Sequence, residues 1–511
     1  MMSRQLLGLL VCVGLLGCQQ SPDATAAPAS ERAAAVEFAD GLPWLNVSEP
    51  LSLEKLRGKV VLLDFWTYGC VNCMHVIPDL QRLQAKYGNK LAVIAVHSPK
   101  FENEKNFNTL RNIVVRYGIE HPVVNDVDFS QWRSYGIRAW PTQVVIDPAG
   151  GAVTSVSGEG NYDRLDKVIG DLVAEFEGRL DESPLPVSLE KDRLKDSTLA
   201  APGKIEVTDR WVAISDTLHH RILFADHDGK VQHIFGGPEK GYVDGSKAEA
   251  RFNQPQGVVF DGDNTVYVAD TGNHTIRRID LDQGTVETAA GTGKNEFYLG
   301  GEKPARSLGL RSPWDLALRD GQLYVAMAGS HQIWKMDLER DVIGPWAGSG
   351  RESIIDGPVA TSAFSQPSGL DIEGDWLYVA DSEDSAVRRI HLSEERVETL
   401  VGTGLFDFGD RNGSFDQALL QHVLGVAVID GERIAVADTY NHQLKELHLG
   451  ERQVSTLAGT GQPEGGAGAL NEPGGLSYWN GKLYVADTNN DRVMVLDLDG
   501  GTFAVWPVWL K

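Results

Sequence analysis

The chain has 511 residues, 42% of them hydrophobic. Because a single hydrophobic core stops growing at roughly 250 to 300 residues, we expect two or more domains. Its 71 acidic residues outnumber its 47 basic ones, and the formal net charge is −24. That balance argues against a nucleic-acid or anionic-lipid surface, which needs clustered Lys and Arg, so we expect no nucleic-acid partner. Four cysteines are too few for a disulfide-stapled scaffold.

The first residues are typical of a secretory signal peptide, which we expect over residues 1–17. Arg4 supplies the positive charge, and Leu6–Leu16 is an apolar run interrupted only by small residues. At about a dozen residues the run is too short to span a bilayer, which takes roughly 20. It ends in Leu15-Leu16-Gly17-Cys18, which resembles the bacterial lipobox, where cleavage precedes an acylated cysteine. The alternative is an ordinary signal peptide with an incidental cysteine.

Lipidation of Cys18 would make the mature chain a membrane-attached lipoprotein that faces the periplasm of a bacterial cell envelope. Cys12 would leave with the signal peptide, so Cys70 and Cys73 would be the free thiols that remain. Residues 18–36 are rich in Ala, Pro, Ser and Thr without an apolar period. That composition predicts a flexible tether, with order beginning near Phe38.

Residues 37–178 alternate apolar runs with amphipathic helical patterns, which is typical of a mostly parallel α/β sheet. The expected strands are Val60–Trp66, Leu91–His97, Gln143–Asp147 and Ala152–Ser157. The expected helices are Val71–Tyr87, Glu104–Tyr117 and Asp163–Glu177. Cys70 and Cys73 lie where the first strand turns into the first helix. This order, with an X-Pro ahead of the later strands, resembles the thioredoxin fold.

The resemblance implies a redox pair that cycles between two thiols and a disulfide. At a helix N-terminus, the thiolate of Cys70 is stabilised by unpaired backbone N–H groups and the helix dipole, so we expect it to be the nucleophile. Cys73, one turn further and more buried, is placed to attack the mixed disulfide that Cys70 forms. Val71 and Asn72 stand between the cysteines instead of the commonest family dipeptides, so the direction of electron flow stays open.

Two further site residues follow from the same resemblance. Asp64 stands six residues before Cys70, where thioredoxins carry a buried Asp thought to handle the proton of the second thiol. A carboxylate is costly to bury in an apolar strand, so we expect a raised pKa and a role in proton transfer. Trp140-Pro141-Thr142 matches the cis-proline loop that faces the two cysteines in that family, and we expect Pro141 to be cis and to shape the substrate groove.

The cysteine pair admits other interpretations. A c-type haem site needs His directly after the second cysteine, but Met74 stands there. A zinc site needs a second pair of ligands at suitable spacing, and the sequence offers none. A structural disulfide closing so small a loop would restrict the unfolded chain little. Cu(I) held by the thiolates with His75 or His97 stays open, although we expect no cofactor and no metal.

Residues 179–200 contain Pro184 and Pro186 and show little helical periodicity, which predicts a semi-rigid linker. An alternative is that residues 185–189 form a strand lent to the second domain.

Residues 201–511 repeat. Each unit contains a strand that mostly ends in Val-Ala-Asp, and the last residues of these strands step by 54, 57, 54, 57 and 49. Six units of four short strands predict an all-β, six-bladed β-propeller. The units resemble NHL repeats, best in residues 268–277 and 436–442, whereas the third has Met327 in place of Asp. The strand ends are Asp216, Asp270, Met327, Asp381, Asp438 and Asp487.

Four histidines recur four residues after these strand ends. They invite a metal-ligand interpretation, but the fourth and sixth units carry Ser and Asp there, which a ring of metal ligands would not tolerate. We expect turn residues that satisfy backbone groups. The six positions are His220, His274, His331, Ser385, His442 and Asp491.

The two halves together resemble the family of NHL repeat-containing protein 2 and its bacterial relatives, in which a thioredoxin-like domain precedes an NHL propeller. Residues 101–105 and 121–126 match that family beyond the shared fold. The resemblance implies a multidomain chain and one of two functions. The first is a thiol–disulfide oxidoreductase acting on protein cysteines with a redox partner protein, its propeller serving as a partner-binding platform. The second is a non-catalytic interaction scaffold that works through the propeller.

Overall fold

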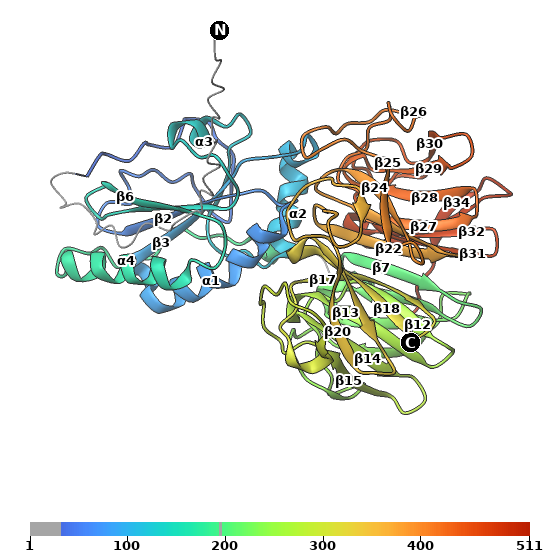
Figure 1. The fold of residues 1–511 in the computed structure, drawn as a ribbon. Coiled ribbons are helices and arrows are strands. Elements are labelled where there is room, and N and C mark those ends of the chain that lie inside the picture. The colour runs from blue at the N-terminus through green and yellow to red at the C-terminus, as the bar shows by residue number, and fades with distance from the viewer. Residues whose placement is uncertain (1–31, 194–196, 511) are drawn as a thin grey trace, which may run out of the picture.

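The computed structural model describes residues 32–193 and 197–510. The expected signal peptide, Cys18 and most of the expected tether lie outside these residues. The chain forms a thioredoxin-like α/β domain followed by a six-bladed β-propeller, as predicted, and the two domains pack side by side (Figure 1). No helix in the described part of the chain is long and apolar enough to cross a membrane.

Residues 32–193 form one six-stranded sheet in the order β1-β4-β3-β2-β5-β6, in which β2, β3 and β4 run parallel and β5 runs antiparallel to β2. These apolar central strands are buried on both faces, as parallel strands between two layers must be. The strands are β1 (Trp44–Leu45), β2 (Val60–Trp66), β3 (Leu91–His97), β4 (Val123–Asn125), β5 (Thr142–Ile146) and β6 (Ala152–Ser157), and the helices are α1 (Val71–Tyr87), α2 (Phe107–Arg116), α3 (Ser130–Ser134) and α4 (Tyr162–Glu175).

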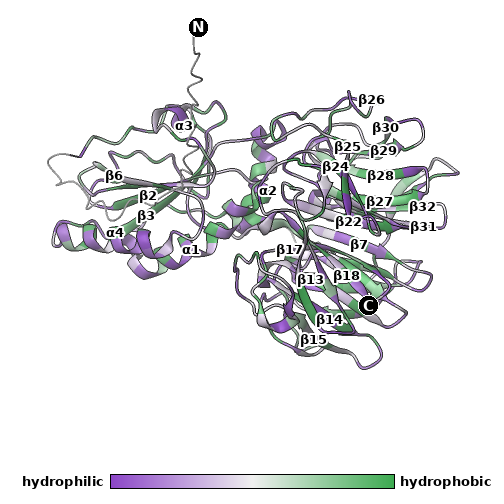
Figure 2. Cartoon of the chain, viewed as in Figure 1, coloured by the Kyte–Doolittle hydropathy of each residue, from purple (hydrophilic) through white to green (hydrophobic). Residues whose placement is uncertain are grey.

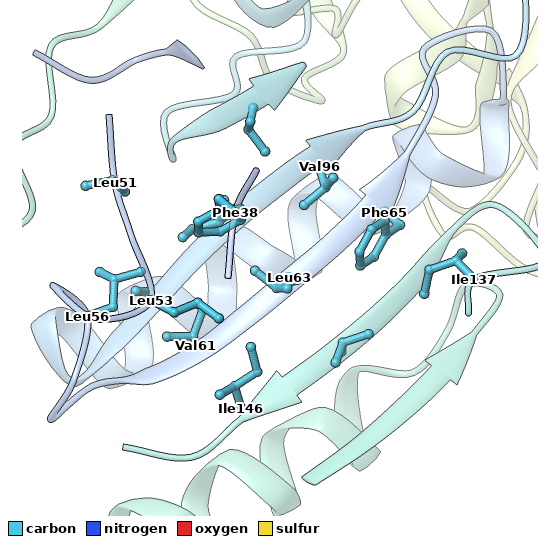
Figure 3. Close-up of a cluster of buried hydrophobic side chains, with 14 residues drawn as sticks. Phe38, Leu51, Leu53, Leu56, Val61, Leu63, Phe65, Val96, Ile137 and Ile146 are labelled. Atoms are coloured by element: carbon cyan, nitrogen blue, oxygen red, sulfur yellow. The ribbon is translucent and has the colours of Figure 1, made fainter. Parts of the chain in front are cut away.

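Alternate side chains of β2 point to opposite faces of the sheet and into separate cores. One set packs under α1 and α4, whose outer surfaces are polar (Figure 2). The other set meets α3 and the segment before β2, and Figure 3 shows the resulting cluster of Phe38, Leu51, Leu53, Leu56, Val61, Leu63, Phe65, Val96, Ile137 and Ile146.

The ends of β5 and α4 differ from the expected bounds by one or two residues, and β1, β4 and α3 were not expected. Three further expectations also differ from the structure. The second helix begins at Phe107 and not at Glu104, because the side chain of Asn106 caps it by accepting the N–H groups of residues 108 and 109. Order begins before Phe38, since Ala34 pairs with Gly151 at the edge of the first domain. Residues 185–189 remain with the first domain, where Val187 pairs with Val47.

Residues 197–510 form six antiparallel sheets, here called blades one to six in chain order. Blade one comprises β7 (Pro202–Val207), β8 (Val212–Asp216), β9 (Arg221–Ala225) and β10 (Val231–Gly236). Blade two comprises β12 (Val258–Asp261), β13 (Thr265–Asp270), β14 (Thr275–Asp280) and β15 (Thr285–Ala290), with β11 (Gly245–Ser246) at its outer edge. Blade three comprises β17 (Pro313–Arg319), β18 (Gln322–Met327), β19 (Gln332–Asp337) and β20 (Val342–Ala347), with β16 (Lys303–Pro304).

Blade four comprises β22 (Pro367–Glu373), β23 (Trp376–Asp381), β24 (Ala386–His391) and β25 (Arg396–Val401), with β21 (Gly357–Pro358). Blade five comprises β27 (Gly425–Asp430), β28 (Arg433–Asp438), β29 (Gln443–His448) and β30 (Gln453–Ala458), with β26 (Gly413–Ser414). Blade six comprises β31 (Pro473–Trp479), β32 (Lys482–Asp487), β33 (Arg492–Asp497) and β34 (Phe503–Trp506).

The four histidines and their two substitutes join each blade to the next, which confirms that they are turn residues. Each lies in a left-handed turn, and its side chain accepts a backbone N–H from the following blade. His331 Nδ1, for example, accepts the N–H of Gln366 at 3.1 Å, and Asp491 closes the circle with the N–H of Ala201 at 2.7 Å. The acceptors are His220, His274, His331, Ser385, His442 and Asp491.

The ring is also closed at its outer edge. The N–H of Val231 in blade one donates to the carbonyl of Trp509 at 3.0 Å, and the N–H of Trp509 donates to Gly229 at 2.8 Å. Residues that follow blade six therefore complete the first blade, which leaves that edge paired.

Candidate redox site

Cys70 and Cys73 lie at the first turn of α1, directly after β2. Cys70 is the N-cap residue, in an extended conformation with φ −90° and ψ 113°, and its side chain is partly exposed. Cys73 is fully buried. Among the described residues both cysteines are free thiols, so the structure represents the dithiol form and contains no disulfide here.

Asp64 lies behind the buried thiol, in the middle of β2, and is 2% exposed. Its Oδ1 accepts the side-chain N–H of Gln143 at 2.9 Å. Burial raises the pKa of Asp64 to about 7, although that hydrogen bond opposes the shift. The pKa of Cys73 is raised well above its ordinary value by burial, by a hydrogen bond with Cys70 and, to a smaller extent, by the charge of Asp64. The carboxyl group is therefore placed to hold a proton near the second thiol.

Pro141 is buried at the start of β5 and follows a cis peptide bond with Trp140, as predicted. Trp140 packs into the same apolar cluster as both cysteines. The structure thus places Asp64 close to Cys73, and it places Trp140, the neighbour of Pro141, in the apolar cluster of the two cysteines.

Glu104 is a buried residue of the site for which the sequence predicted no role in the redox chemistry. Its Oε1 accepts the N–H of Gly69 at 2.8 Å, and its Oε2 bonds to the hydroxyl of Thr67 and to the N–H of Lys100, the latter at 2.6 Å. Burial raises the pKa of Glu104 to about 7. The carboxyl group thereby fixes the loop that leads into Cys70. Its one sequence signal was its place in the family-like stretch 101–105.

The first domain sits on one face of the propeller through a set of residues here called the docking ring. Each member precedes the first strand of a blade, has a positive φ, and donates its N–H to the turn residue of the preceding blade. Within the described residues, five of the six side chains contact the first domain through the CxxC loop, α1, α2 or the segment before α2. The docking ring consists of Ala201, Gln254, Ser312, Gln366, His422 and Glu472.

A buried ion pair joins the same two domains beside the cysteines. Lys100 Nζ contacts Glu383 Oε2 of blade four, and the two side chains are 6% and 3% exposed. Burial opposes the charged amine, but the charge and hydrogen bond of Glu383 raise the pKa of Lys100, with smaller contributions from Glu352 and Cys70. A cation is thus held near the partly exposed thiol.

The two histidines considered for copper have other partners. His75 bonds through Nδ1 to Glu159 at 2.6 Å and through Nε2 to Ser312 of the docking ring at 2.7 Å. His97 Nδ1 bonds to Asn125 at 3.0 Å, and burial lowers the pKa of His97 to about 4. In the described ranges no group of three or more His, Cys, Asp or Glu side chains is arranged to hold a metal ion.

A cavity of about 610 Å³ lies between α1, the end of α2 and blades one to three. Its lining includes Val71 and Met74 of the first helical turns and Arg311 of blade three. Arg311 pairs with Glu159 of the first domain. Its backbone N–H donates to the sulfur of Met327 at 3.3 Å, where the other blades use their Asp.

Comparisons with known proteins agree with this division. The family model for thioredoxin-like proteins matches residues 58–152, and that for the NHL repeat matches residues 252–279, 310–336 and 470–496. Over the first domain, the thiol-disulfide oxidoreductase ResA of Halalkalibacterium halodurans is 34% identical across 103 residues, which cover 20% of this chain and 56% of that protein.

Two relatives match nearly the whole chain. NHL repeat-containing protein 2 of Bos taurus is 42% identical over 524 residues, covering 93% of this chain and 71% of that protein. Protein SUPPRESSOR OF QUENCHING 1, chloroplastic, of Arabidopsis thaliana is 42% identical over 502 residues, covering 91% of this chain but 47% of that protein. The chain therefore spans about half the length of the plant relative. From this likeness along both domains, the chain belongs to the family of NHL repeat-containing protein 2.

Proposed function

We propose that the chain is a thiol–disulfide oxidoreductase that exchanges electrons with protein cysteines through Cys70 and Cys73. One observation carries the proposal: a partly exposed thiol at a helix N-terminus has a buried thiol and a carboxyl group of raised pKa behind it. That arrangement supplies a nucleophile, a second thiol and a proton acceptor in sequence. The relationship of the first domain to thiol–disulfide oxidoreductases supports it.

In the reducing direction, the thiolate of Cys70 attacks one sulfur of a substrate disulfide. The substrate S–S bond breaks, and its leaving thiolate takes up a proton. Cys73 then loses its proton to Asp64 and attacks the sulfur of Cys70, which releases the second substrate thiolate. The substrate gains two electrons and two protons, and the pair becomes a disulfide that a dithiol redox partner protein reduces. Oxidation of substrates follows the same steps in reverse.

The first domain covers one face of the propeller, where the docking ring lies. A protein substrate would therefore reach the cysteines from the side, past the edge of the propeller. Phe406 of the propeller is 71% exposed, and its ring lies 5.5 Å from the ammonium of Lys100. Phe408 packs in the cluster that contains Cys70. An exposed aromatic ring beside Lys100, and a second one in the cysteine cluster, suit a protein partner.

The trapping experiment uses the full chain. The Cys73→Ser variant should accumulate mixed disulfides with other proteins through Cys70, because the second attack is removed. The matched Cys70→Ser variant should accumulate none. The oxidoreductase proposal fails if Cys73→Ser traps no protein and the wild type neither reduces nor oxidises a model disulfide.

The same chain would work at a membrane of the bacterial envelope, held through a lipid on Cys18. In a bacterial host the Cys18→Ser variant should leave the membrane fraction, whereas wild type should take up labelled fatty acid. Wild type that carries no label would show that the attachment is wrong while leaving the thiol chemistry untouched.

A scaffold function is the second candidate. Five docking-ring side chains hold the thioredoxin-like domain on the propeller, which restricts the approach of a folded protein to the cysteines. The trapping experiment decides between the two, since a scaffold forms no mixed disulfides.

A further inference from the structure

The helix that carries the cysteines is capped by the other domain. The side chain of its N-cap residue, Cys70, makes no capping hydrogen bond within the described residues, and an uncapped first turn leaves N–H groups unpaired. Gln366 of the docking ring supplies a partner for the first of these N–H groups. Its Oε1 accepts the N–H of Val71 at 2.8 Å, and its Nε2 donates to the carbonyl of Gly69 at 2.8 Å. One carboxamide thus bridges the two residues that flank Cys70.

Gln366 is itself held in place from both sides of its backbone. It is 3% exposed, its N–H donates to His331 Nδ1 at 3.1 Å, and its carbonyl accepts the hydroxyl of Ser368 at 2.8 Å. On the opposite side of the loop, Gly69 donates its N–H to Glu104. The backbone around Cys70 is therefore fixed between a carboxyl group of its own domain and a carboxamide of the propeller.

Gly69 shows how closely these groups approach. A Cβ at this position would lie 3.0 Å from Oε1 of Glu104 and 3.3 Å from the ring of His422 in the docking ring. Such contacts are tighter than ordinary van der Waals packing, so the loop, Glu104 and the propeller leave little room for an alternative path of the backbone.

Gln254 offers an internal comparison. It is the same residue type at the equivalent docking-ring position of blade two, and its Nε2 donates to the carbonyl of Arg116 at 2.8 Å. That contact joins the same two domains at the end of α2 without touching the residues that flank Cys70. Substitution of Gln254 therefore removes an interdomain hydrogen bond without changing the contacts beside Cys70, whereas substitution of Gln366 removes those contacts.

We propose that Gln366 is a positioning residue for the chemistry of Cys70, contributed by the propeller to the redox site. An N-cap acceptor receives N–H groups from the second and third helical residues, so the thiolate of Cys70 depends on a first turn with a fixed orientation. By holding Val71, Gln366 keeps that turn in place. By bonding to Gly69, it fixes the carbonyl dipole, whose negative end would repel the thiolate if it turned towards the sulfur. This role serves catalysis only if the proposed function is correct, but the tests below measure exchange and alkylation and need no oxidoreductase activity.

The first test compares Gln366→Leu with Gln254→Leu in the full chain. Hydrogen exchange reports the N–H of Val71, and peptide mapping after timed alkylation with iodoacetamide reports Cys70. Gln366→Leu should speed exchange at Val71 at least tenfold and slow alkylation of Cys70 at pH 7 at least fivefold. Gln254→Leu should leave both at wild-type values. Unchanged values in Gln366→Leu, or equal changes in both variants, would overturn the proposal.

The second test uses Gln366→Glu, which nearly preserves size and therefore serves even if the Leu variant does not fold. Protonated, the introduced carboxyl group can accept from Val71 and donate to Gly69; ionised, it cannot donate and adds a negative charge. The wild-type to variant ratio of Cys70 alkylation rates should be near one in acid and rise at least tenfold by pH 8. A ratio that stays constant across this range contradicts the assigned role.

These outcomes are independent of the proposed function. If Cys73→Ser traps no protein but Gln366 still controls the reactivity of Cys70, the oxidoreductase function is wrong and the positioning role stands. If trapping succeeds but substitution of Gln366 changes neither the alkylation rate of Cys70 nor the exchange rate of Val71, the function stands and this inference is wrong.

Discussion

Lys100 of the thioredoxin-like domain and Glu383 of propeller blade four form an ion pair from which solvent is almost excluded, next to the redox cysteines. Both side chains are buried by the packing of the two domains, so the pair exists only while they are docked. Blade four carries two acids, Glu383 and Asp384, at the second and third positions of its turn, where the other blades carry no acid.

Breaking this pair should cost far more than breaking a surface pair. Replacing one member leaves a buried charge without its partner, which typically costs about 3 to 5 kcal/mol. We expect Lys100→Met to lower the free energy of unfolding more than Glu383→Gln. Burial raises the pKa of Asp384 to about 6 and the charge of Lys100 opposes that rise, so loss of Lys100 removes a stabilising charge from a second carboxylate. The double variant should recover most of the loss. Denaturant unfolding of the four proteins gives the complete cycle.

The matched control is Lys167, which pairs with Asp171 across one turn of α4 with both side chains about 70% exposed. Lys167→Met should change stability by less than about 1 kcal/mol. An equally small effect at Lys100 would mean that the interdomain pair contributes nothing to docking.

Asp64 should make the protein less stable as the pH rises. Its folded pKa is raised to about 7, above the unfolded value of about 3.9. Between these values the folded state holds a proton that the unfolded state has lost, so stability falls with increasing pH up to about 7. Asp64→Asn removes this dependence. The variant should gain on the order of 3 to 4 kcal/mol relative to wild type between pH 4 and pH 8. A constant difference between the two unfolding free energies would contradict the burial argument.

His331 should make the protein less stable as the pH falls, the opposite of the effect of Asp64. Burial lowers its folded pKa to about 4, below the unfolded value of about 6.5. Between these two pH values the imidazole is protonated in the unfolded state but not in the folded state. Stability is therefore lost as the pH falls below about 6.5. His331→Asn keeps an acceptor for the next blade, on the precedent of Asp491, and does not titrate. Relative to wild type it should gain about 2 kcal/mol on going from pH 8 to pH 5, measured by denaturant unfolding.

The strand–turn–helix around the cysteines could be predicted because its signals are local. The apolar run of β2 and the helical spacing of α1 gave bounds identical to those observed. Strands β1 and β4 were missed because two or three residues are too few to show a periodicity. The propeller could be predicted from repetition alone. Equivalent residues such as Asp270 and Asp438 recur at a regular spacing, so each unit helps to identify the bounds of the others.

The docking ring could not be predicted in the same way. Gln366 contacts Val71 from 295 positions away in the sequence, and nothing local distinguishes its side chain from that of Gln254. The burial of Glu104 was missed for a similar reason, because its partners come from the turn before Cys70. Contacts between domains depend on which part of one surface faces the other, and periodic patterns carry no such information.

The closing contact between blade one and Trp509 has a consequence for the order of assembly on the ribosome. The first domain can fold soon after its own residues emerge, but the propeller becomes a closed ring only once blade six has been made, and its outer edge is paired only once Trp509 follows. Until then the docking ring is incomplete, because Glu472 belongs to the last blade, and the two thiols lack the cover of the other domain. The interval between synthesis of the first domain and ring closure is therefore when Cys70 is most open to unwanted oxidation.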